Sequence, residues 1–436
     1  MRMRLPRLRP DGEPGPRGPN EPEPGLGARQ TDVILRVRFV VALARSLHRY
    51  GTPAPRLEEA IDAVAATIGL VCNINSSPTS LVFSFREQGG PETMLSELTR
   101  VVRLAPGSLD LRRLSLADAV AEDVLAGRLD IDAGYTRLLE IEAMPASAPG
   151  LVVFAFGLIA AALAVLLERG WVDVAAAGAI GLVVGIIAQV FGRRPNLAPS
   201  TEAVCAVTAT LLAHAFSSLV HPLSVQTVIL ASLIVLLPGM MLTTAINELA
   251  TQHLVSGVAR LAGAFAALLK LTFGVVAATQ IAQLFGWTVV ESSVGPVPAW
   301  VLWPALVAAA FAFAVNFGAD RRDYPLVMAA AIGSYVIARY VGPGVGSGAG
   351  VFVAALVACA AGNLYARIWR RPGALIRLPG IILLVPGSVG FRSLTHAFER
   401  DVTMSLDTGF TLLSILITLV AGLLFGNLLV PPRRSL

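Results

Sequence analysis

Two ionisable residues stand inside the apolar C-terminal two thirds of the chain. Lys270 is the only lysine in the sequence and lies within a long apolar run, and Glu202 follows Pro199-Ser200-Thr201 at the start of another. A charge at membrane depth costs roughly 2.5–3.5 kcal/mol on insertion scales, so Lys270 should face protein or water. Partial burial moves a carboxyl pKa toward neutral, as proton coupling requires. We therefore interpret Glu202 as a proton-coupling residue, and Lys270 as the group that sets its pKa or binds a substrate carboxylate.

Each of these residues also has a purely structural interpretation. Lys270 lies on a long helix, where a lysine near the interface extends its ammonium group toward water. Glu202 lies in the first turn of its helix, where the helix dipole stabilises a carboxylate and Ser200 or Thr201 caps the end. The sequence leaves both interpretations open.

Two Pro-Gly pairs, Pro238-Gly239 and Pro386-Gly387, interrupt apolar runs. Proline has no N–H and glycine has free dihedral angles, so the pair exposes backbone amides and carbonyls that are able to bind a zwitterion. Asn247 and Glu248 follow the first pair and offer hydrogen bonds to an amino or hydroxyl group. We predict these six residues as substrate-binding, near the membrane midplane and between the breaks. The alternative is a kink needed only for packing.

The composition is that of a polytopic membrane protein. Of 436 residues 55% are hydrophobic and 14% are charged, with the charges concentrated in the first third. The net charge of +5 sits mostly on Arg at the ends of apolar runs, which argues against a nucleic-acid partner. Three distant cysteines without CxxC spacing argue against a metal site or a disulfide framework, and no cofactor motif occurs. The expected partners are a small-molecule substrate and the lipid bilayer, with a homo-oligomer left open.

The chain divides into four regions. Residues 1–30 are rich in Pro, Gly and charge, and we predict a disordered tail. Residues 31–149 predict a small soluble α+β domain with helices over 33–47, 55–68, 116–126 and 133–142. Its strands are expected over 70–74, 80–85 and 100–104, with a turn at 75–79. Residues 150–286 and 299–430 each predict five membrane spans, since about 20 apolar residues cross a bilayer. The ten spans are expected near 150–168, 172–192, 200–220, 223–243, 258–286, 299–318, 324–341, 347–366, 375–391 and 408–430.

Arginine alternates between successive connections, which predicts the topology. With the N-terminal domain inside, the predicted inner connections carry Arg193-Arg194, Arg260, Arg321-Arg322 and Arg370-Arg371, and the outer ones are poor in Arg apart from the last. We therefore expect an inner (cytoplasmic) membrane protein with both termini in the cytoplasm. The basic start lacks an apolar segment, so no secretory signal is expected there. Arg-rich and Lys-poor usage suggests a bacterial source.

The membrane region repeats itself. Ala179-Ile180-Gly181 matches 331–333, Leu236-Leu237-Pro238-Gly239 matches 384–387, and Leu271 with Gly274 matches Leu419 with Gly422. An odd number of spans inverts the second half relative to the first. Inverted repeats are typical of secondary transporters with alternating access. Gln189, His214, Asn316 and Asn363 are polar residues inside spans, for which we expect interhelical hydrogen bonds.

These features together resemble the threonine/serine exporter family. The resemblance rests on Leu47–Tyr50 with Gly51 and Arg56–Ala60, the turn 76–79, the segment 237–249 with Ser256-Gly257 and Arg260-Leu261, and Pro386-Gly387. It covers about residues 31–430. The resemblance implies export of small hydroxy amino acids, driven by the membrane potential or a proton gradient.

Three function classes remain to be compared. A secondary exporter agrees with the inverted repeat and its paired breaks. A passive channel, or a carrier for another small metabolite, agrees with the scarcity of charge in the spans. A membrane enzyme is not expected, because no HExxH, GxSxG or Walker A motif occurs. The N-terminal domain is expected to regulate or gate, since its His48, Asp62, Ser76 and Ser77 form no recognisable triad.

Overall fold

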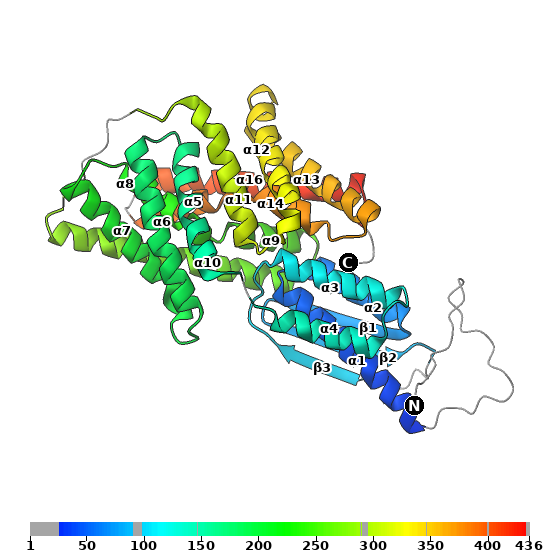
Figure 1. The fold of residues 1–436 in the computed structure, drawn as a ribbon. Coiled ribbons are helices and arrows are strands. Elements are labelled where there is room, and N and C mark those ends of the chain that lie inside the picture. The colour runs from blue at the N-terminus through cyan, green and yellow to red at the C-terminus, as the bar shows by residue number, and fades with distance from the viewer. Residues whose placement is uncertain are drawn as a thin grey trace.

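The structure is a computed structural model of the chain, and it describes residues 26–89, 98–145, 147–287, 289, 295–345, 347–398 and 401–432. An N-terminal α+β domain lies against one end of a helical membrane region (Figure 1). The predicted tail over residues 1–30 falls largely outside these ranges, and α1 (Leu26–Arg49) begins ahead of the predicted boundary.

The N-terminal domain packs four helices on a three-stranded antiparallel sheet of order β1-β2-β3. Its elements after α1 are α2 (Ala54–Thr67), β1 (Leu70–Ser77), β2 (Ser80–Glu87), β3 (Leu98–Arg103), α3 (Leu111–Leu125) and α4 (Ile131–Ala143). Gly69 ends α2 with a φ of +78°, a conformation that glycine adopts without strain. The predicted elements are confirmed, but the predicted turn at 75–79 was too long. Ser77 pairs with Ser80, because each side chain hydrogen-bonds across the tight hairpin.

The membrane region contains nine helices long and apolar enough to span a bilayer within the described residues, or ten when one bent pair counts as a span. The elements are α5 (Pro149–Leu166), α6 (Trp171–Gly192), α7 (Thr201–Leu219), α8 (Val225–Leu233), α9 (Gly239–Ala250), α10 (Leu254–Leu284), α11 (Leu302–Asn316), α12 (Tyr324–Val345), α13 (Ser347–Trp369), α14 (Ala374–Ile382), α15 (Gly387–Phe398) and α16 (Val402–Leu429). The expected polytopic α-helical fold behind a small α+β domain is confirmed.

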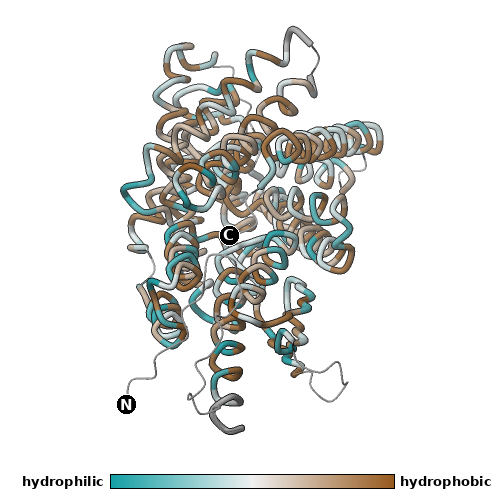
Figure 2. The backbone as a smooth tube through the Cα atoms, turned by 90° about the vertical axis from the view of Figure 1, so that its right-hand side faces the viewer, coloured by the Kyte–Doolittle hydropathy of each residue, from teal (hydrophilic) through white to brown (hydrophobic). Residues whose placement is uncertain are grey.

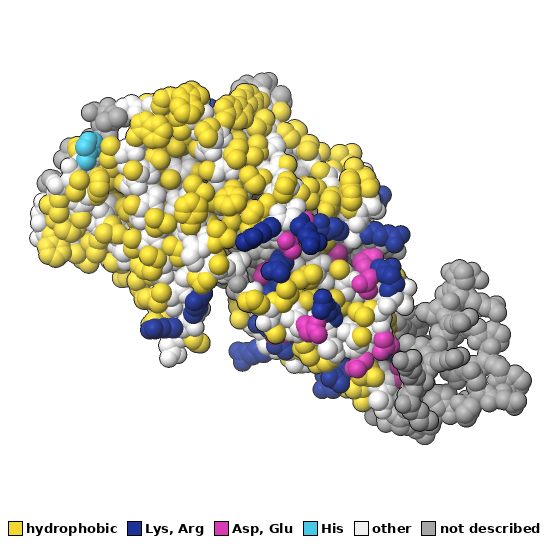
Figure 3. Space-filling view, in the orientation of Figure 1, with side chains coloured by type: hydrophobic (Ala, Val, Ile, Leu, Met, Phe, Trp, Pro, Cys, Tyr) yellow, Lys and Arg dark blue, Asp and Glu magenta, His cyan; other side chains and the backbone are white. Residues whose placement is uncertain are grey.

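The surface separates the two parts by polarity. Figure 2 shows hydrophobic residues along most of the membrane helices and a mixed pattern in the N-terminal domain. In Figure 3 the membrane region presents an almost continuous hydrophobic face, while acidic and basic side chains gather on the N-terminal domain. Large hydrophobic side chains such as Phe273, Phe410 and Leu428 are 63%, 68% and 74% exposed, as expected for residues that face lipid.

Both Pro-Gly pairs break a span. The pair α8 and α9 bends by 57° at Pro238. In the second half, the break at Pro386 separates α14 from α15 without a comparable bend, because the two helices together count as one span over Ala374–Phe398. The two halves also agree in length: α8 and α14 have 9 residues each, and α9 and α15 have 12 each.

Packing contacts repeat almost atom for atom between the halves. A Cβ on Gly274 would meet the Ala203 carbonyl oxygen and Ala206 Cβ on α7. A Cβ on Gly422 would meet the Phe352 carbonyl oxygen and the Cβ of Ala355 on α13. These contacts relate α10 to α16 by a shift of 148 residues and α7 to α13 by a shift of 149. The repeat that three short sequence matches indicated is therefore present in the packing.

Candidate functional site

The two helix breaks meet between the two halves, where the membrane region faces the N-terminal domain. A Cβ on Gly239 would lie 3.1 Å from the amide nitrogen of Gly387, and a Cβ on Gly387 would lie 3.1 Å from Gly239 Cα. A side chain on Gly239 would also overlap Val385. Only glycine at both positions permits this approach, because any larger residue would push the two chains apart. In this conformation no room for a substrate remains directly between Gly239 and Gly387.

A cavity of about 290 Å³ lies beside this contact, and both Gly239 and Gly387 line it. Its polar side chains from the membrane region are Thr244, Arg260 and Asn316. The N-terminal domain closes part of it with Gly51 and Pro53 from the α1–α2 loop and with Gly107 and Leu109 ahead of α3. The cavity therefore combines main chain at both breaks with a few polar groups, the composition typical of a small-molecule site.

Glu248 joins the N-terminal domain to the membrane region. It is fully buried, and its carboxylate accepts hydrogen bonds from the Ala54 amide at 3.1 Å and from Ser256 Oγ at 2.9 Å. Arg260 donates to both oxygens from Nε at 3.0 Å and from Nη2 at 3.1 Å. Ala54 is the first residue of α2, so a carboxylate here is favoured by the helix dipole. In this conformation the predicted substrate ligand Glu248 binds the chain itself.

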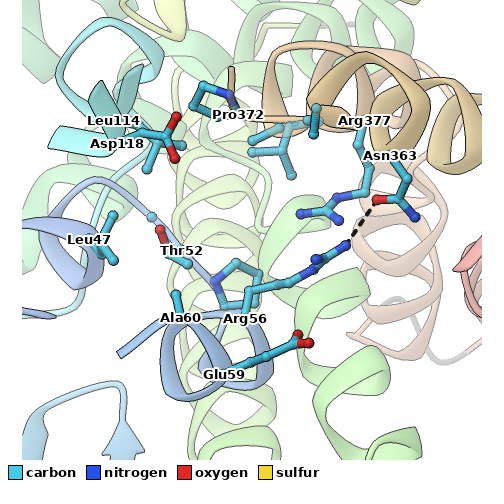
Figure 4. Close-up of a pocket in the computed structure, with 16 residues that line it drawn as sticks. Leu47, Thr52, Arg56, Glu59, Ala60, Leu114, Asp118, Asn363, Pro372 and Arg377 are labelled. Atoms are coloured by element: carbon cyan, nitrogen blue, oxygen red, sulfur yellow. Dashed lines mark hydrogen bonds between the residues drawn. The ribbon is translucent and has the colours of Figure 1, made fainter. Parts of the chain in front are cut away.

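The first turn of α2 inserts a second polar contact into the membrane region. Arg56 donates to Asn363 Oδ1 on α13 at 3.0 Å and to Asn427 Oδ1 on α16 at 3.5 Å. Figure 4 shows Arg56, Arg377 and Asn363 directed toward one another where the two parts meet. Burial, and then the neighbouring Arg377, lower the pKa of Arg56 to about 10. Arg56 is therefore charged at neutral pH, although the burial of its charge costs free energy.

Other contacts extend the docking interface. The Leu111 amide donates to the Phe317 carbonyl at 2.9 Å, and the Arg112 amide donates to the Gly318 carbonyl at 3.1 Å. The first amides of α3 thereby pair with the carbonyls that directly follow α11. Glu58 lies 3.2 Å from His253, which precedes α10. Desolvation raises the pKa of Glu58, and the Ser76 amide and His253 oppose that shift.

Glu202 and Lys270 form an ion pair. Lys270 Nζ lies 2.9 Å from Glu202 Oε2 and donates to the Pro199 carbonyl at 3.2 Å. The side chains are 38% and 26% exposed for Lys270 and Glu202, so the pair is neither deeply buried nor fully solvated. The repeat places Thr418 and Val351 at the equivalent positions of the second half, so this pair breaks the internal symmetry.

Comparison with known proteins identifies the family. A family model described as "Putative threonine/serine exporter" matches residues 38–282, and one described as "Threonine/Serine exporter, ThrE" matches residues 303–429. The chain belongs to the threonine/serine exporter family. The two matches divide the chain between α10 and α11, where the structure also divides into its two halves.

Curated relatives of this chain occur in yeasts. Pheromone-regulated membrane protein 10 of Debaryomyces hansenii is 27% identical over 83% of this chain and 37% of its own length. The protein of that name in Zygosaccharomyces rouxii is 26% identical over 92% of this chain and 43% of its own. A Schizosaccharomyces pombe protein, C7D4.12c, is 25% identical over 93% of this chain and 57% of its own. The chain thus spans about half the length of these relatives. No solved structure matches it.

Asn247 and the polar residues inside spans complete the candidate site. Asn247 lines a further cavity with Arg56, Arg377 and Asn427. Asn363 Nδ2 donates to Asn427 Oδ1 at 2.8 Å, which confirms the expected interhelical bond. Arg56, Arg377 and Asn427 were not predicted as site residues. The only sequence signal was that Arg56 lies within a segment shared with the family.

The equivalent polar pair of the first half is His214 on α7 and Thr279 on α10. The His214 Nε2 to Thr279 Oγ1 distance is 3.5 Å. The residue shifts of 149 and 148 that relate the Gly274 and Gly422 contacts also relate this pair to Asn363 and Asn427. The Asn363–Asn427 pair contacts Arg56 of the N-terminal domain. The described residues that line the cavity at His214 and Thr279 all belong to the membrane region. His253, just before α10, contacts Glu58 of the N-terminal domain, and Thr279 lies 26 residues further along, about 39 Å at 1.5 Å per residue. The His214–Thr279 pair therefore lies far from the docked end of α10.

Proposed function

We propose that this chain is a secondary active exporter of small polar amino acids, threonine and serine in particular, driven by the proton motive force. The observation that supports this most is the meeting of two repeat-related helix breaks beside the cavity that Gly239 and Gly387 line, which we call the central cavity because it lies between the two halves. Broken helices at a repeat interface supply amides for a carboxylate and carbonyls for an ammonium group, so a zwitterion is bound without a dedicated charged side chain.

We place the substrate in the cavity that Gly239, Gly387, Thr244 and Asn316 line, with Pro238 and Pro386 setting the breaks. Asn247 lines the neighbouring cavity on the path to it. Glu248 then acts indirectly, by fixing Arg260 at the cavity wall. The Gly239–Gly387 contact leaves no open path between the breaks, and this favours a carrier over a passive channel.

The N-terminal domain acts as a gate on one side. Its two loops at Gly51–Pro53 and Gly107–Leu109 cover the central cavity, so substrate entry from that side requires them to move. The Arg distribution along the connections favours a cytoplasmic location for this domain and for both termini, in a bacterial inner membrane. Under that orientation the structure is closed to the cytoplasm.

We assign proton coupling to the Glu202–Lys270 ion pair. Protonation of Glu202 removes its attraction for Lys270, so the pair is a contact between α7 and α10 that a proton can release. The two helices also meet at Gly274, one turn along α10. Loss of the ion pair would therefore act directly on the packing of the first half.

Counterflow of labelled threonine in proteoliposomes tests the proposal. Vesicles loaded with unlabelled threonine or serine should accumulate external label transiently, and vesicles loaded with a large amino acid should not. Export against a gradient should collapse with a protonophore. A label flux that is unaffected by internal substrate would indicate a channel and contradict the proposal.

A further inference from the structure

A second cavity lies at the end of the membrane region opposite to the docked N-terminal domain. It measures about 440 Å³, within the range of roughly 300–1,000 Å³ that is usual for small-molecule sites. Its polar side chains include Arg169, His214, Gln226, Thr279 and Thr395. They come from the α5–α6 connection and from four separate helices, so the cavity gathers donors from both halves.

Two buried side-chain nitrogens in this cavity have no hydrogen-bond partner among the described residues, and the one on Arg169 is a donor. His214 is 6% exposed, and its Nδ1 makes no hydrogen bond. Arg169 Nε is buried and also makes none, while its Nη1 donates to Ser224 Oγ at 3.4 Å. A buried donor without an acceptor costs free energy, so it marks a place where an acceptor is missing.

The chemistry of these donors selects the ligand. A guanidinium group with a free N–H binds a carboxylate through charge-assisted hydrogen bonds, and an imidazole N–H, a hydroxyl and an amide extend that set. We propose that this cavity is a carboxylate-binding site, with Arg169 as the principal partner and with His214 and Thr279 beside it. That the ligand is the exported amino acid, bound before release, rests on the proposed function.

The internal repeat supports this assignment independently. At the docking end, the Asn363–Asn427 pair is occupied by the guanidinium group of Arg56. At the opposite end, the equivalent pair of His214 and Thr279 faces a cavity that Arg169 also lines. Each end thus joins a polar interhelical pair to an arginine from outside those two helices. Within the described part of the chain, the far-end group contains buried side-chain nitrogens without a partner, namely Arg169 Nε and His214 Nδ1.

A local probe tests the site in the full chain. Leu167 lines this cavity and is 37% exposed, so a cysteine placed there reports on its occupancy through the rate of maleimide labelling. Cys72, Cys205 and Cys359 are buried, so background labelling should be slow. We expect L-threonine and 2-hydroxybutyrate, which carry a carboxylate, to slow the labelling of Leu167→Cys, and threoninol, which lacks one, to have no effect.

Substitutions then separate the site from the central cavity. In the Leu167→Cys background, Arg169→Gln should raise the half-protecting concentration at least about tenfold, the size of one charge-assisted hydrogen bond, and Arg169→Lys should recover part of it. Arg193→Gln, an exposed arginine outside the cavity, should leave it unchanged. His214→Asn with Thr279→Asn, which copies the other end, should retain protection, and His214→Phe should lose it.

The outcomes are distinguishable from those of the transport assay. Protection by carboxylates that disappears in Arg169→Gln supports the site even if no threonine counterflow occurs. Counterflow without protection, or protection that Arg169→Gln does not weaken, overturns the site and leaves the exporter proposal intact. Protection by inorganic phosphate but not by carboxylates also overturns it, because the site would then hold a different class of anion.

Discussion

Gly239 and Gly387 are separated by 148 positions, yet a methyl group on Gly239 would lie only 3.2 Å from Gly387 Cα. Each of these glycines begins a helix immediately after a proline, and each belongs to a different half of the repeat. Their contact fixes how closely the halves approach. A change of conformation that moves one half relative to the other must therefore move this contact.

Replacement of either glycine should stop transport without unfolding the protein. In Gly239→Val the new side chain overlaps Val385, and in Gly387→Val it meets Leu237 and Gly239, so the halves are forced apart. We expect threonine counterflow to fall to background, with normal yield and a single peak in size-exclusion chromatography. Gly333→Ala is the control, since nothing lies within 4 Å of its Cβ position. Normal transport by both valine variants would reduce the breaks to structural features.

Glu202→Gln should uncouple transport from the pH gradient. The substitution keeps the size of the side chain but removes the charge that Lys270 contacts at 2.9 Å. We expect threonine exchange to continue at a similar rate, while accumulation driven by an imposed pH gradient disappears. Glu140→Gln, on an exposed surface pair of the N-terminal domain, should behave as wild type. If Glu202→Gln still concentrates substrate, the coupling group lies elsewhere.

Glu248→Ala should release the N-terminal domain from the membrane region. The change leaves the Arg260 guanidinium and the Ala54 amide without their acceptor, and loss of one partner of a buried pair costs about 3–5 kcal/mol. We expect faster proteolysis of the connection at residues 144–148 and a lower midpoint of thermal unfolding. Glu140→Ala, which removes an exposed ion pair, should change neither measurement appreciably.

Acid should destabilise the N-terminal domain through His48. Burial lowers the pKa of His48 below its ordinary 6.5, so the unfolded chain binds this proton first. The contribution of neutral His48 to the free energy of unfolding is therefore fully present above about pH 6.5. It is lost as the pH falls through that value toward the lower pKa of His48 in the folded protein. Charged groups near His48 act in opposite directions, Arg260 lowering and Glu248 raising its pKa.

Urea unfolding of the full chain at pH 7.5 and pH 5.5 measures this effect. The loss of stability between the two values should be smaller in His48→Gln than in the wild type. The raised pKa of Glu58 makes the folded state more stable as the pH falls toward 4.5, opposite to the effect of His48. Both the wild type and His48→Gln contain Glu58, so its contribution cancels when the two are compared. An equal loss in both proteins would remove His48 as the cause.

The sequence predicts the elements well because their signals are local. Apolar length identifies the spans, and Pro-Gly chemistry identifies both breaks. Pairing between distant residues has no such signal. Glu202 and Lys270 were each recognised as unusual, but they are 68 positions apart and nothing in the sequence between them indicates that they touch. Glu248 was predicted as a substrate ligand from its place after the first Pro-Gly pair. No sequence pattern indicates that its carboxylate accepts a hydrogen bond from the Ala54 amide, 194 positions earlier.

Sequence patterns also do not predict that α2 docks on the membrane region. Arg56 looks like one surface arginine among many, since its partners Asn363 and Asn427 lie on helices at the other end of the chain. By contrast, the shift that relates the Pro-Gly pairs predicts the equivalence of Thr279 with Asn427. That equivalence identifies a contact only once the structure shows that Thr279 lies against His214 and Asn427 against Asn363.

The connection between α4 and α5 limits how the N-terminal domain is able to move. Helix α4 ends at Ala143 and α5 begins at Pro149, so residues 144–148 alone join the two parts. A segment of that length reaches about 17 Å when fully extended. A released domain therefore swings on a short tether and stays at the cavity mouth. Its return is an intramolecular event at an effective concentration on the order of millimolar, so reclosure needs no encounter and a separately added domain would compete poorly.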